Sequence, residues 1–405
     1  MSQSKIIAGL EIGTSKTCMA VGEIKPDATT TILAIGEVPS AGVRKGEIAD
    51  PSMARQCICD AWQLAQDMAD VDILSVVLSV TGDHIKGENN QGSYRLPDDE
   101  DIIEEEHTRY ALQKARHMEI SSDRLVVSCE EGGYSVDGRR ATYNPVGLAG
   151  RTLDINCHVV HGISTRLQNS LLCVRQVPLE VEDMVFAPIA TAQMVFTRRQ
   201  KDAGALLIDI GAGTTDYVCF KDGEIIASGC VPVGGNAINQ DIMQLIGQRV
   251  SMKAAEKLKC TEGNAWGDVK DNSMAHYRSE NGLHDVSVRR GALNEIIRNR
   301  LCEILLLVRE GIPRELLRRN AIGVYLCGGT SLMRGLDGLA QYVFGTEVFQ
   351  PPPLVPGQPH SYQSDPRYCT AIGLIRYAQM FDAEDDYRKS SGFFGRLFNF
   401  FGLGR

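Results

Sequence analysis

Two glycine-bearing turns, each preceded by an acidic residue, contain the residue types of this sequence that are best suited to chemistry. The first turn contains Gly13, Thr14, Ser15 and Lys16, and the second contains Gly211, Ala212, Gly213, Thr214 and Thr215. The backbone N–H groups of such turns can point into one concavity and bind phosphate oxygens, and the hydroxyl groups add further donors. Lys16 can neutralise phosphate charge. The pattern therefore predicts two phosphate-binding loops.

Glu11 precedes the first turn and Asp209 precedes the second, so a fold that brings the turns together makes the two carboxylates face each other across a cleft. We expect them to hold a hydrated Mg²⁺, which keeps most of its waters and needs few protein ligands. The alternative is that each turn is an ordinary hairpin and each acid a solvated strand end. Because the unit occurs twice, we favour the phosphate and magnesium site.

The two turns belong to a longer repeated unit. Residues 7–17 read IAGLEIGTSKT and residues 206–215 read LLIDIGAGTT, and each copy continues into a second β-prone run that ends near Gly-Glu-Ile. A strand, a tight turn and a strand at the head of each half predict a duplicated α/β domain with a cleft between the halves.

The hydrophobic pattern predicts the elements that must support these turns. Strands are expected at 73–80, 205–209, 217–220, 224–231 and 323–327. Helices are expected near 53–68, 188–198, 236–247, 252–259, 291–310, 332–344 and 370–379. Residues 82–161 interrupt this order and indicate an inserted subdomain, with an acidic, helix-like stretch at 98–116 and short strands around 125–129, 134–136 and 154–160.

Composition and charge exclude several classes of protein. Of 405 residues, 43% are apolar and 23% charged, which is typical of a globular chain. The net charge is −9, so we expect no nucleic-acid partner, because phosphate backbones attract clustered Lys and Arg. The 12 cysteines contain no C-x-x-C pair, which indicates neither a zinc site nor a disulfide framework. We find no secretory signal and no run of about 18 apolar residues that could span a bilayer, so an intracellular protein is expected.

Five segments together resemble the ATP-binding signature of the actin, Hsp70 and sugar-kinase superfamily. They are LEIGTSK (10–16), FAPIATAQMV (186–195), LIDIGAGTTD (207–216), VYLCGGTSLMRGL (324–336) and YCTAIGLIRYA (368–378). Within that superfamily, NPVGLAG (144–150), PVGGNAINQDI (232–242) and AEKLK (255–259) are similar to segments of the bacterial cell-division family FtsA. The resemblance implies an actin-like, two-lobed, duplicated ribonuclease-H-type α/β fold with an inserted α+β subdomain and a C-terminal amphipathic helix.

The resemblance also implies that the ligands are ATP and Mg²⁺, and it assigns further residues to them. Gly234, Gly235 and Asn236 would line the second half of the cleft. Glu256 and Lys259 would contact the ribose or adenine, although without the resemblance they would be taken as an exposed helical pair. The adenosine would be contacted by Gly328, Gly329, Thr330 and Met333.

One position departs from the superfamily pattern. In actin and Hsp70 relatives the first connecting helix has a Gln or Glu that positions the attacking water, whereas Ala187 occupies that position here. Alanine can neither accept a proton nor orient water, and such positioning is worth about 10²–10⁴ in rate. Gln193 lies on another face of that helix. We therefore expect ATP binding with weak or no ATPase activity, and assign no catalytic residue.

The last residues form a separate aromatic segment. Residues 381–392 are predicted to be a polar linker, and residues 393–405 read FFGRLFNFFGLGR. At about 100° per residue, one helix face gathers Phe393, Phe394, Leu397, Phe398, Phe400 and Phe401, and Arg396 lies on the other side. Such a helix would lie in a membrane interface with its arginines near anionic headgroups. The alternatives are docking on the protein's own core or in the groove of a partner.

These predictions divide the chain into parts. The first lobe core comprises 1–81 with 162–200 and 360–380, and the second lobe core comprises 201–237 with 301–359. The insertion is 82–161, the smaller subdomain of the second lobe is 238–300, and 381–392 links the body to the helix at 393–405.

By resemblance, the chain would polymerise with itself on the cytoplasmic face of the inner membrane at the division septum. It would bind lipid through its C-terminal helix, tether the tubulin-like protein FtsZ by binding the FtsZ C-terminal tail on 238–300, and recruit later division proteins through the insertion. One alternative is a relative of the pilus-assembly ATP-binding protein PilM, which would attach to the membrane through its partners. The other is a small-molecule kinase, which would need a catalytic Asp that the inserted region does not offer.

Overall fold

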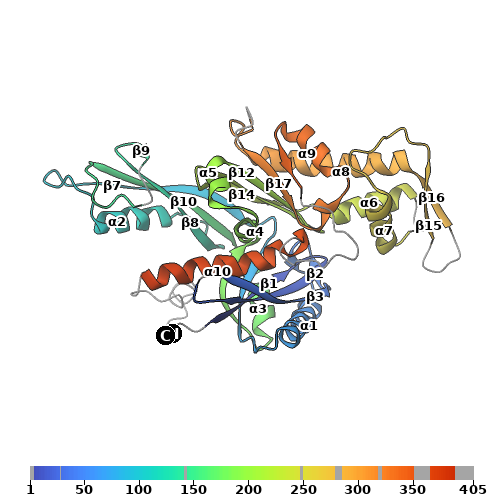
Figure 1. Ribbon diagram of the computed structural model, residues 1–405, viewed down its shortest axis with the longest axis horizontal. Helices are drawn as coiled ribbons and strands as arrows, with labels where there is room; N and C mark the ends of the chain where they lie inside the picture. Colours follow the sequence, from blue (N-terminus) through green and yellow to red (C-terminus); the bar gives the residue numbers. More distant parts are fainter. Residues whose placement is uncertain are drawn as a thin grey trace.

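The computed structural model describes residues 4–27, 29–140, 144–246, 250–278, 285–317, 322–350 and 365–387. Two lobes are joined by two central helices, α4 and α10, and a further sheet extends to one side (Figure 1). Each lobe is built on a five-stranded sheet, with strand order β11-β6-β1-β2-β3 in the first lobe and β14-β13-β12-β17-β18 in the second. This duplication confirms the predicted α/β fold.

The sheet of the first lobe begins with the strand–turn–strand unit. It comprises β1 (Lys5–Ile12), β2 (Lys16–Ile24), β3 (Thr30–Pro39), β6 (Ser75–Val80) and β11 (Glu180–Phe186). Helix α1 (Pro51–Ala69) packs on β3, and it begins at Asp50, whose carboxylate accepts from the N–H groups of Ser52 and Met53. Helix α3 (Ser164–Arg175) packs beside α1. The core of this lobe reaches into both central helices.

The second lobe repeats the arrangement. Its sheet comprises β12 (Ala205–Ile210), β13 (Thr215–Lys221), β14 (Glu224–Val231), β17 (Gly323–Cys327) and β18 (Val348–Phe349). Around it lie α5 (Arg198–Ala203), α8 (Arg290–Glu310) and α9 (Leu336–Phe344). The outer part contains α6 (Gly235–Ile246), α7 (Met252–Glu262) and the hairpin of β15 (Met274–Arg278) and β16 (Asp285–Arg289).

The inserted segment forms its own sheet, with strand order β7-β10-β8-β9, and lies on the opposite side of the molecule from α6 and α7 (Figure 1). Its elements are β7 (Lys86–Arg95), α2 (Glu105–Arg116), β8 (Arg124–Val136), β9 (Arg139–Arg140) and β10 (Thr152–Ile163). A separate hydrophobic core lies between α2 and the sheet and includes the fully buried Ile103 and Leu153.

The insertion contacts both lobes. Nε2 of the buried His158 lies 2.7 Å from Ser228 Oγ of β14 in the second lobe. The Gly133 N–H donates to Glu224 Oε1, also of β14, at 3.1 Å. On the other side the Tyr377 hydroxyl of α10 donates to Glu130 Oε1 at 3.1 Å. A rearrangement of the lobes must therefore strain or break contacts of the insertion.

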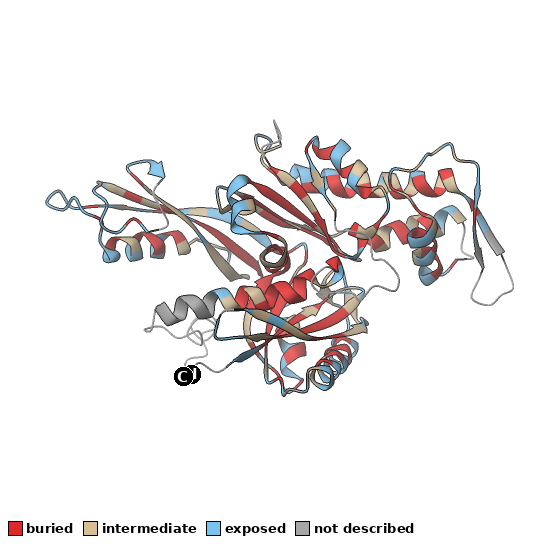
Figure 2. Cartoon of the chain, viewed as in Figure 1, coloured by how far each residue is buried: buried red, intermediate tan, exposed pale blue. Residues whose placement is uncertain are grey.

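The central helices α4 (Ala187–Val195) and α10 (Cys369–Tyr387) are largely buried where they cross between the lobes (Figure 2). A Cβ atom on Gly373 of α10 would lie 2.0 Å from the Ala190 carbonyl oxygen of α4. Glycine therefore permits this close crossing, and any larger residue would push the helices apart.

Some predicted boundaries were wrong, each for a local reason. The helix expected at 98–116 begins at Glu105, after a capping box formed by Glu104 and His107. The two strands expected at 125–129 and 134–136 are one strand, β8, because the glycine pair between them shifts the register of its pairing with β10 without ending the strand. The helix expected at 188–198 ends at Val195, because a second helix is capped by Thr197.

Other differences lie near the end of the chain. The helix expected at 332–344 is a 3₁₀ turn, η1 (Gly329–Leu332), followed by α9, because Gly335 adopts a φ of +74° at the helix start. Helix α10 extends to Tyr387, so the first part of the predicted linker is helical. The remainder of the linker and the predicted membrane segment, 388–405, lie outside the described residues. No helix in the described part of the chain is long and apolar enough to cross a bilayer.

Candidate functional site

A cavity of about 770 Å³ lies between the two lobes. Its walls come from both glycine turns, from the starts of α4 and α10, from α7 and from the turn after β17. The repeated units thus form the two facing walls of one cleft, as the sequence predicts.

The two turns have the same backbone closure. In the first, the Gly13 N–H donates to the Lys16 carbonyl oxygen at 2.9 Å, and in the second the Gly211 N–H donates to the Thr214 carbonyl oxygen at 2.9 Å. The turns meet where a Cβ atom on Gly213 would lie 2.4 Å from Thr14 Oγ1. Glycine is therefore needed for the two loops to approach this closely.

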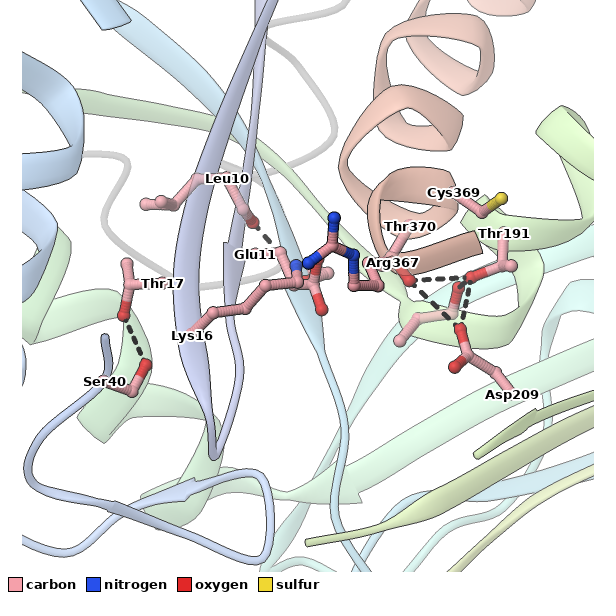
Figure 3. Close-up of polar contacts among 12 residues, drawn as sticks. Leu10, Glu11, Lys16, Thr17, Ser40, Thr191, Asp209, Arg367, Cys369 and Thr370 are labelled. Carbon is pink, nitrogen blue, oxygen red and sulfur yellow. Dashed lines mark hydrogen bonds and ion pairs between the residues drawn. The ribbon is translucent and has the colours of Figure 1, made fainter. Parts of the chain in front are cut away.

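Glu11 and Lys16 form an ion pair at the first turn. Lys16 Nζ lies 2.7 Å from Glu11 Oε2, and both side chains point into the cleft beside Arg367 (Figure 3). Burial would lower the pKa of Lys16, but the Glu11 carboxylate outweighs burial and raises it. Lys16 is therefore charged at every physiological pH, and the first turn largely neutralises its own acid.

Asp209 of the second turn accepts hydrogen bonds from two threonine hydroxyls. Thr191 Oγ1 of α4 and Thr370 Oγ1 of α10 each lie 3.2 Å from Asp209 Oδ2 (Figure 3). Burial, followed by the negative charges of Glu11 and Asp216, raises the pKa of Asp209 to about 7. The carboxylate thus lies between the two connecting helices and in repulsion with two other acids.

Asp216 is a third acid of the cleft, and the sequence analysis did not assign it to the site. It is the second residue of β13 and lines the cavity, where Thr81 Oγ1 donates to its Oδ1 at 2.5 Å and Thr214 Oγ1 to its Oδ2 at 3.3 Å. Burial raises the pKa of Asp216 to about 6. Its membership of the LIDIGAGTTD segment was the signal that could have identified it.

The three acids fit a hydrated cation. Within the described residues, no group of three or more His, Cys, Asp and Glu side chains is arranged to enclose a metal ion. Hydrated Mg²⁺ needs no such cage, because it keeps several waters and takes one or two carboxylates plus phosphate oxygens. The raised pKa values of Asp209 and Asp216 reflect repulsion and burial that a divalent cation would relieve.

The opposite end of the cavity holds the residues predicted to contact the nucleoside. Lys259 Nζ lies 2.6 Å from Glu256 Oε2 and 3.4 Å from the Gly235 carbonyl oxygen, and its side chain is only 4% exposed. The two residues form the helical pair that the alternative interpretation expects, but Lys259 is buried, while the Glu256 side chain is 47% exposed. Thr330 Oγ1 donates to the Gly211 carbonyl oxygen at 3.2 Å, which connects the turn after β17 to the second glycine turn.

The structure brings together nearly all of the predicted nucleotide and metal residues. Those that line the cavity are Glu11, Gly13, Thr14, Ser15, Lys16, Asp209, Gly211, Ala212, Gly213, Thr214, Gly235, Asn236, Glu256, Lys259, Gly328, Gly329, Thr330 and Met333. Thr215 and Gly234 lie behind the wall. Thr215 is fully buried and donates to the Val233 carbonyl oxygen, and a Cβ atom on Gly234 would meet the Gly211 carbonyl oxygen at 2.6 Å.

Ala187 lines the cavity at the start of α4. The Gln193 side chain is engaged elsewhere, since its Oε1 accepts from Lys201 Nζ at 2.6 Å. The cavity residues that sequence reasoning did not assign include Gly46, Ser79, Thr81, Arg367 and Thr370. Thr370 and Arg367 lie in or beside the YCTAIGLIRYA segment, but Gly46 and Thr81 had no comparable signal.

Comparison with known proteins places this geometry in a family. The family model described as "Cell division protein FtsA" matches residues 206–373, and the model described as "SHS2 domain inserted in FTSA" matches residues 82–161. Over 385 residues, covering 93% of this chain and 90% of the relative, the chain is 32% identical to cell division protein FtsA of Escherichia coli (strain K12). The chain belongs to the FtsA family. Cell division protein FtsA of Bacillus subtilis (strain 168) is 30% identical over 388 residues, which cover 93% of this chain and 84% of the relative.

Solved structures of other proteins share the actin-like fold of the FtsA family. The chain superposes on a protein of the PilM–PilN type IV pilus biogenesis complex with a TM-score of 0.63 and 18% identity, over 92% of this chain and 98% of that one. It superposes on MreB5 of Spiroplasma citri bound to ADP with a TM-score of 0.52 and 18% identity, over 96% and 99%. At these identities the likeness shows the fold alone. The PilM alternative thus shares the architecture, whereas the sequence relatives are FtsA proteins.

Proposed function

We propose that the chain binds magnesium–ATP in the cleft and acts as an ATP-dependent, actin-like tether that holds FtsZ at the cytoplasmic membrane of the division septum. The observation that supports this most strongly is the convergence of two phosphate loops and three carboxylates on one cavity in a member of a cell-division family. Fold neighbours bound to ADP and to AMPPNP support a nucleotide as the ligand.

In this proposal each residue group has a separate task. The Gly13 and Gly211 N–H groups close the turns, so the N–H groups that follow them, in Thr14–Lys16 and Ala212–Thr214, bind the phosphates. Asp209, with Glu11 and Asp216 nearby, holds the hydrated cation. Mg²⁺, when bound, neutralises phosphate charge. Gln or Glu is absent at Ala187, and Gln193 is paired with Lys201, so attacking water is poorly oriented. Turnover below about one per second is expected, which suits a nucleotide that controls assembly.

The membrane contact is assigned to the C-terminal segment. Phe393, Phe394, Leu397, Phe398, Phe400 and Phe401 supply the apolar face, and Arg396 supplies charge for anionic headgroups. Because one short helix binds weakly, we propose that polymerisation adds avidity, so that ATP-dependent filaments bind lipid more tightly than monomers do.

The FtsZ tail is proposed to bind the outer part of the second lobe. A groove of about 420 Å³ between α6 and α8 supports this, because it combines charged and apolar side chains and has room for a peptide. It is lined by Asp241, Gln244, Leu245, Ile296, Asn299, Arg300 and Glu303. Later division proteins are proposed to contact the insertion.

Liposome co-sedimentation tests the proposed function. The full chain and a chain ending at Ser391 are mixed with anionic vesicles, with magnesium–ATP or without nucleotide. We expect the full chain to pellet with vesicles, more so with ATP, and the shortened chain to remain in the supernatant. Equal pelleting of the two chains contradicts the role of the segment, and phosphoryl transfer to a small acceptor would favour the kinase alternative.

A further inference from the structure

A short hairpin between β3 and α1 enters the nucleotide cleft, although neither the glycine turns nor the family segments include it. It consists of β4 (Val43–Arg44) and β5 (Glu47–Ile48), joined by Lys45 and Gly46. Lys45 has a φ of +50° and Gly46 a φ of +75°, which are the conformations that a two-residue hairpin turn needs. Gly46 lines the cavity.

The hairpin turn contacts both phosphate loops. The Gly46 N–H donates to Thr14 Oγ1 of the first loop at 3.0 Å. A Cβ atom on Gly46 would lie 2.5 Å from Thr81 Cγ2 and 3.4 Å from Thr214 Cγ2 of the second loop. The segment before the hairpin follows the first loop as well, since the Ser40 N–H donates to the Ser15 carbonyl oxygen at 3.0 Å. The turn is therefore fixed at the point where the two loops meet.

This point lies at one end of the second loop. At the other end of the loop, the Gly211 carbonyl oxygen accepts a hydrogen bond from Thr330, which is one of the residues predicted to contact the nucleoside. Thr214, by contrast, lies beside Gly46. A nucleotide whose nucleoside lies near Thr330 and Lys259 would extend its phosphates along the loop toward the hairpin. The last phosphate of the chain would then be the one nearest to Gly46.

The two phosphate loops contain one lysine, Lys16, and it is held by Glu11 at 2.7 Å. Lys45 is exposed, and within the described residues its ammonium has no hydrogen bond or ion pair. Glu47, the nearest acid of the hairpin, is held by Arg166 Nη1 at 2.8 Å, and the same Arg166 atom lies 2.9 Å from Asp83 at the base of the insertion. Lys45 is thus available to a ligand.

We propose that the Lys45–Gly46 turn is a third phosphate-binding element, which contacts the terminal phosphate of a nucleoside triphosphate and so distinguishes it from a diphosphate. The inference rests on the proposed nucleotide binding. The Lys45 ammonium pairs with the terminal phosphate, a charge-assisted contact that a diphosphate cannot make. The ion pairs of Arg166 with Glu47 and Asp83 connect the hairpin to the base of the insertion.

Titration calorimetry of the full chain with magnesium–AMPPNP and magnesium–ADP tests the proposal. In K45A we expect the AMPPNP affinity to fall about tenfold and the ADP affinity to change less than twofold. K45R restores most of the AMPPNP affinity, because the charge is retained. R44A is the matched control, since it removes the neighbouring exposed cation of the same hairpin, and it leaves both affinities within about twofold.

Equal losses for both nucleotides in K45A, or no loss for either, overturn the proposal while the wild-type affinities still support nucleotide binding. Wild-type protein that binds neither nucleotide overturns the proposed function itself. G46A gives a second check, because its Cβ atom displaces the turn from Thr81. If G46A prefers AMPPNP over ADP as strongly as the wild-type protein does, the result also contradicts the role of the turn.

Discussion

The two glycine turns of this chain, the proposed phosphate loops, have the same backbone closure but differ in how their acids are paired. Both close with the same N–H to carbonyl hydrogen bond of 2.9 Å across four residues. In the first loop Lys16 pairs with Glu11, whereas in the second loop Asp209 accepts from threonine hydroxyls and lies near Asp216. The duplication has thus kept the main-chain closure of the turn, while the side chains differ: the acid of the first loop pairs with a lysine, and the acid of the second accepts from hydroxyls. We expect the metal to depend on the second loop more than on the first.

The largest expected effect comes from removing the charge of Asp209. D209N should weaken magnesium–nucleotide binding by about 100-fold, or about 2.7 kcal/mol, because the cation loses its main carboxylate. E11Q is the matched variant in the first loop, and it should cost less than about tenfold because Glu11 is already paired with Lys16. Calorimetry of both variants checks this order, and equal losses would show that the loops share the metal evenly.

The equivalent first glycines of the two loops allow a matched comparison of stability. A Cβ atom on Gly13 would lie 2.8 Å from the Lys16 carbonyl oxygen, whereas on Gly211 it would lie 3.2 Å from the Thr214 carbonyl oxygen. G13A should therefore lower the free energy of unfolding by about 1–3 kcal/mol, and G211A by less than about 1 kcal/mol. Urea denaturation of the nucleotide-free variants measures both values. A larger loss in G211A would mean that the first loop relaxes more easily than its contacts indicate.

A smaller effect is expected in the pH dependence of stability. The pKa of Asp209 rises from an ordinary 3.8 to about 7 and that of Asp216 to about 6, so the folded chain binds more protons than the unfolded chain between these values. Their contribution to the free energy of unfolding is therefore fully present below about pH 4 and is lost as the pH rises toward 7. The melting temperature of the nucleotide-free protein should change less with pH across this range in D209N than in wild type. Parallel curves for the two proteins would contradict the raised pKa of Asp209.

The sequence predicted those parts of the site that depend on local backbone patterns. The two loops are recognisable because a glycine turn between β-prone runs specifies its own geometry, and because the unit occurs twice. The residues predicted to contact the nucleoside came instead from the family resemblance, and they line the same cavity. The start of α9 was misplaced because Gly335, within an apolar helical pattern, adopts a φ of +74° and caps the helix.

What the sequence did not predict depends on contacts between distant residues. Thr81 and Asp216 form a hydrogen bond of 2.5 Å across the cleft, although they lie far apart in the chain and have no shared pattern. The turn at Lys45 and Gly46 reaches Thr14 through the path of the backbone after β3. The contact of buried His158 with Ser228 of the second lobe likewise required the tertiary structure.

A crystal structure of the chain with AMPPNP and Mn²⁺ tests the central claim most directly, because anomalous scattering locates the manganese ion without assumption. The account predicts one anomalous peak in the cleft, beside Asp209 and closer to the second loop than to the first. The phosphates should lie between Gly13–Lys16 and Gly211–Thr214. A nucleotide bound outside the cleft, or a metal ion held by Glu11 with Asp209 still bonded only to its threonines, would contradict the account.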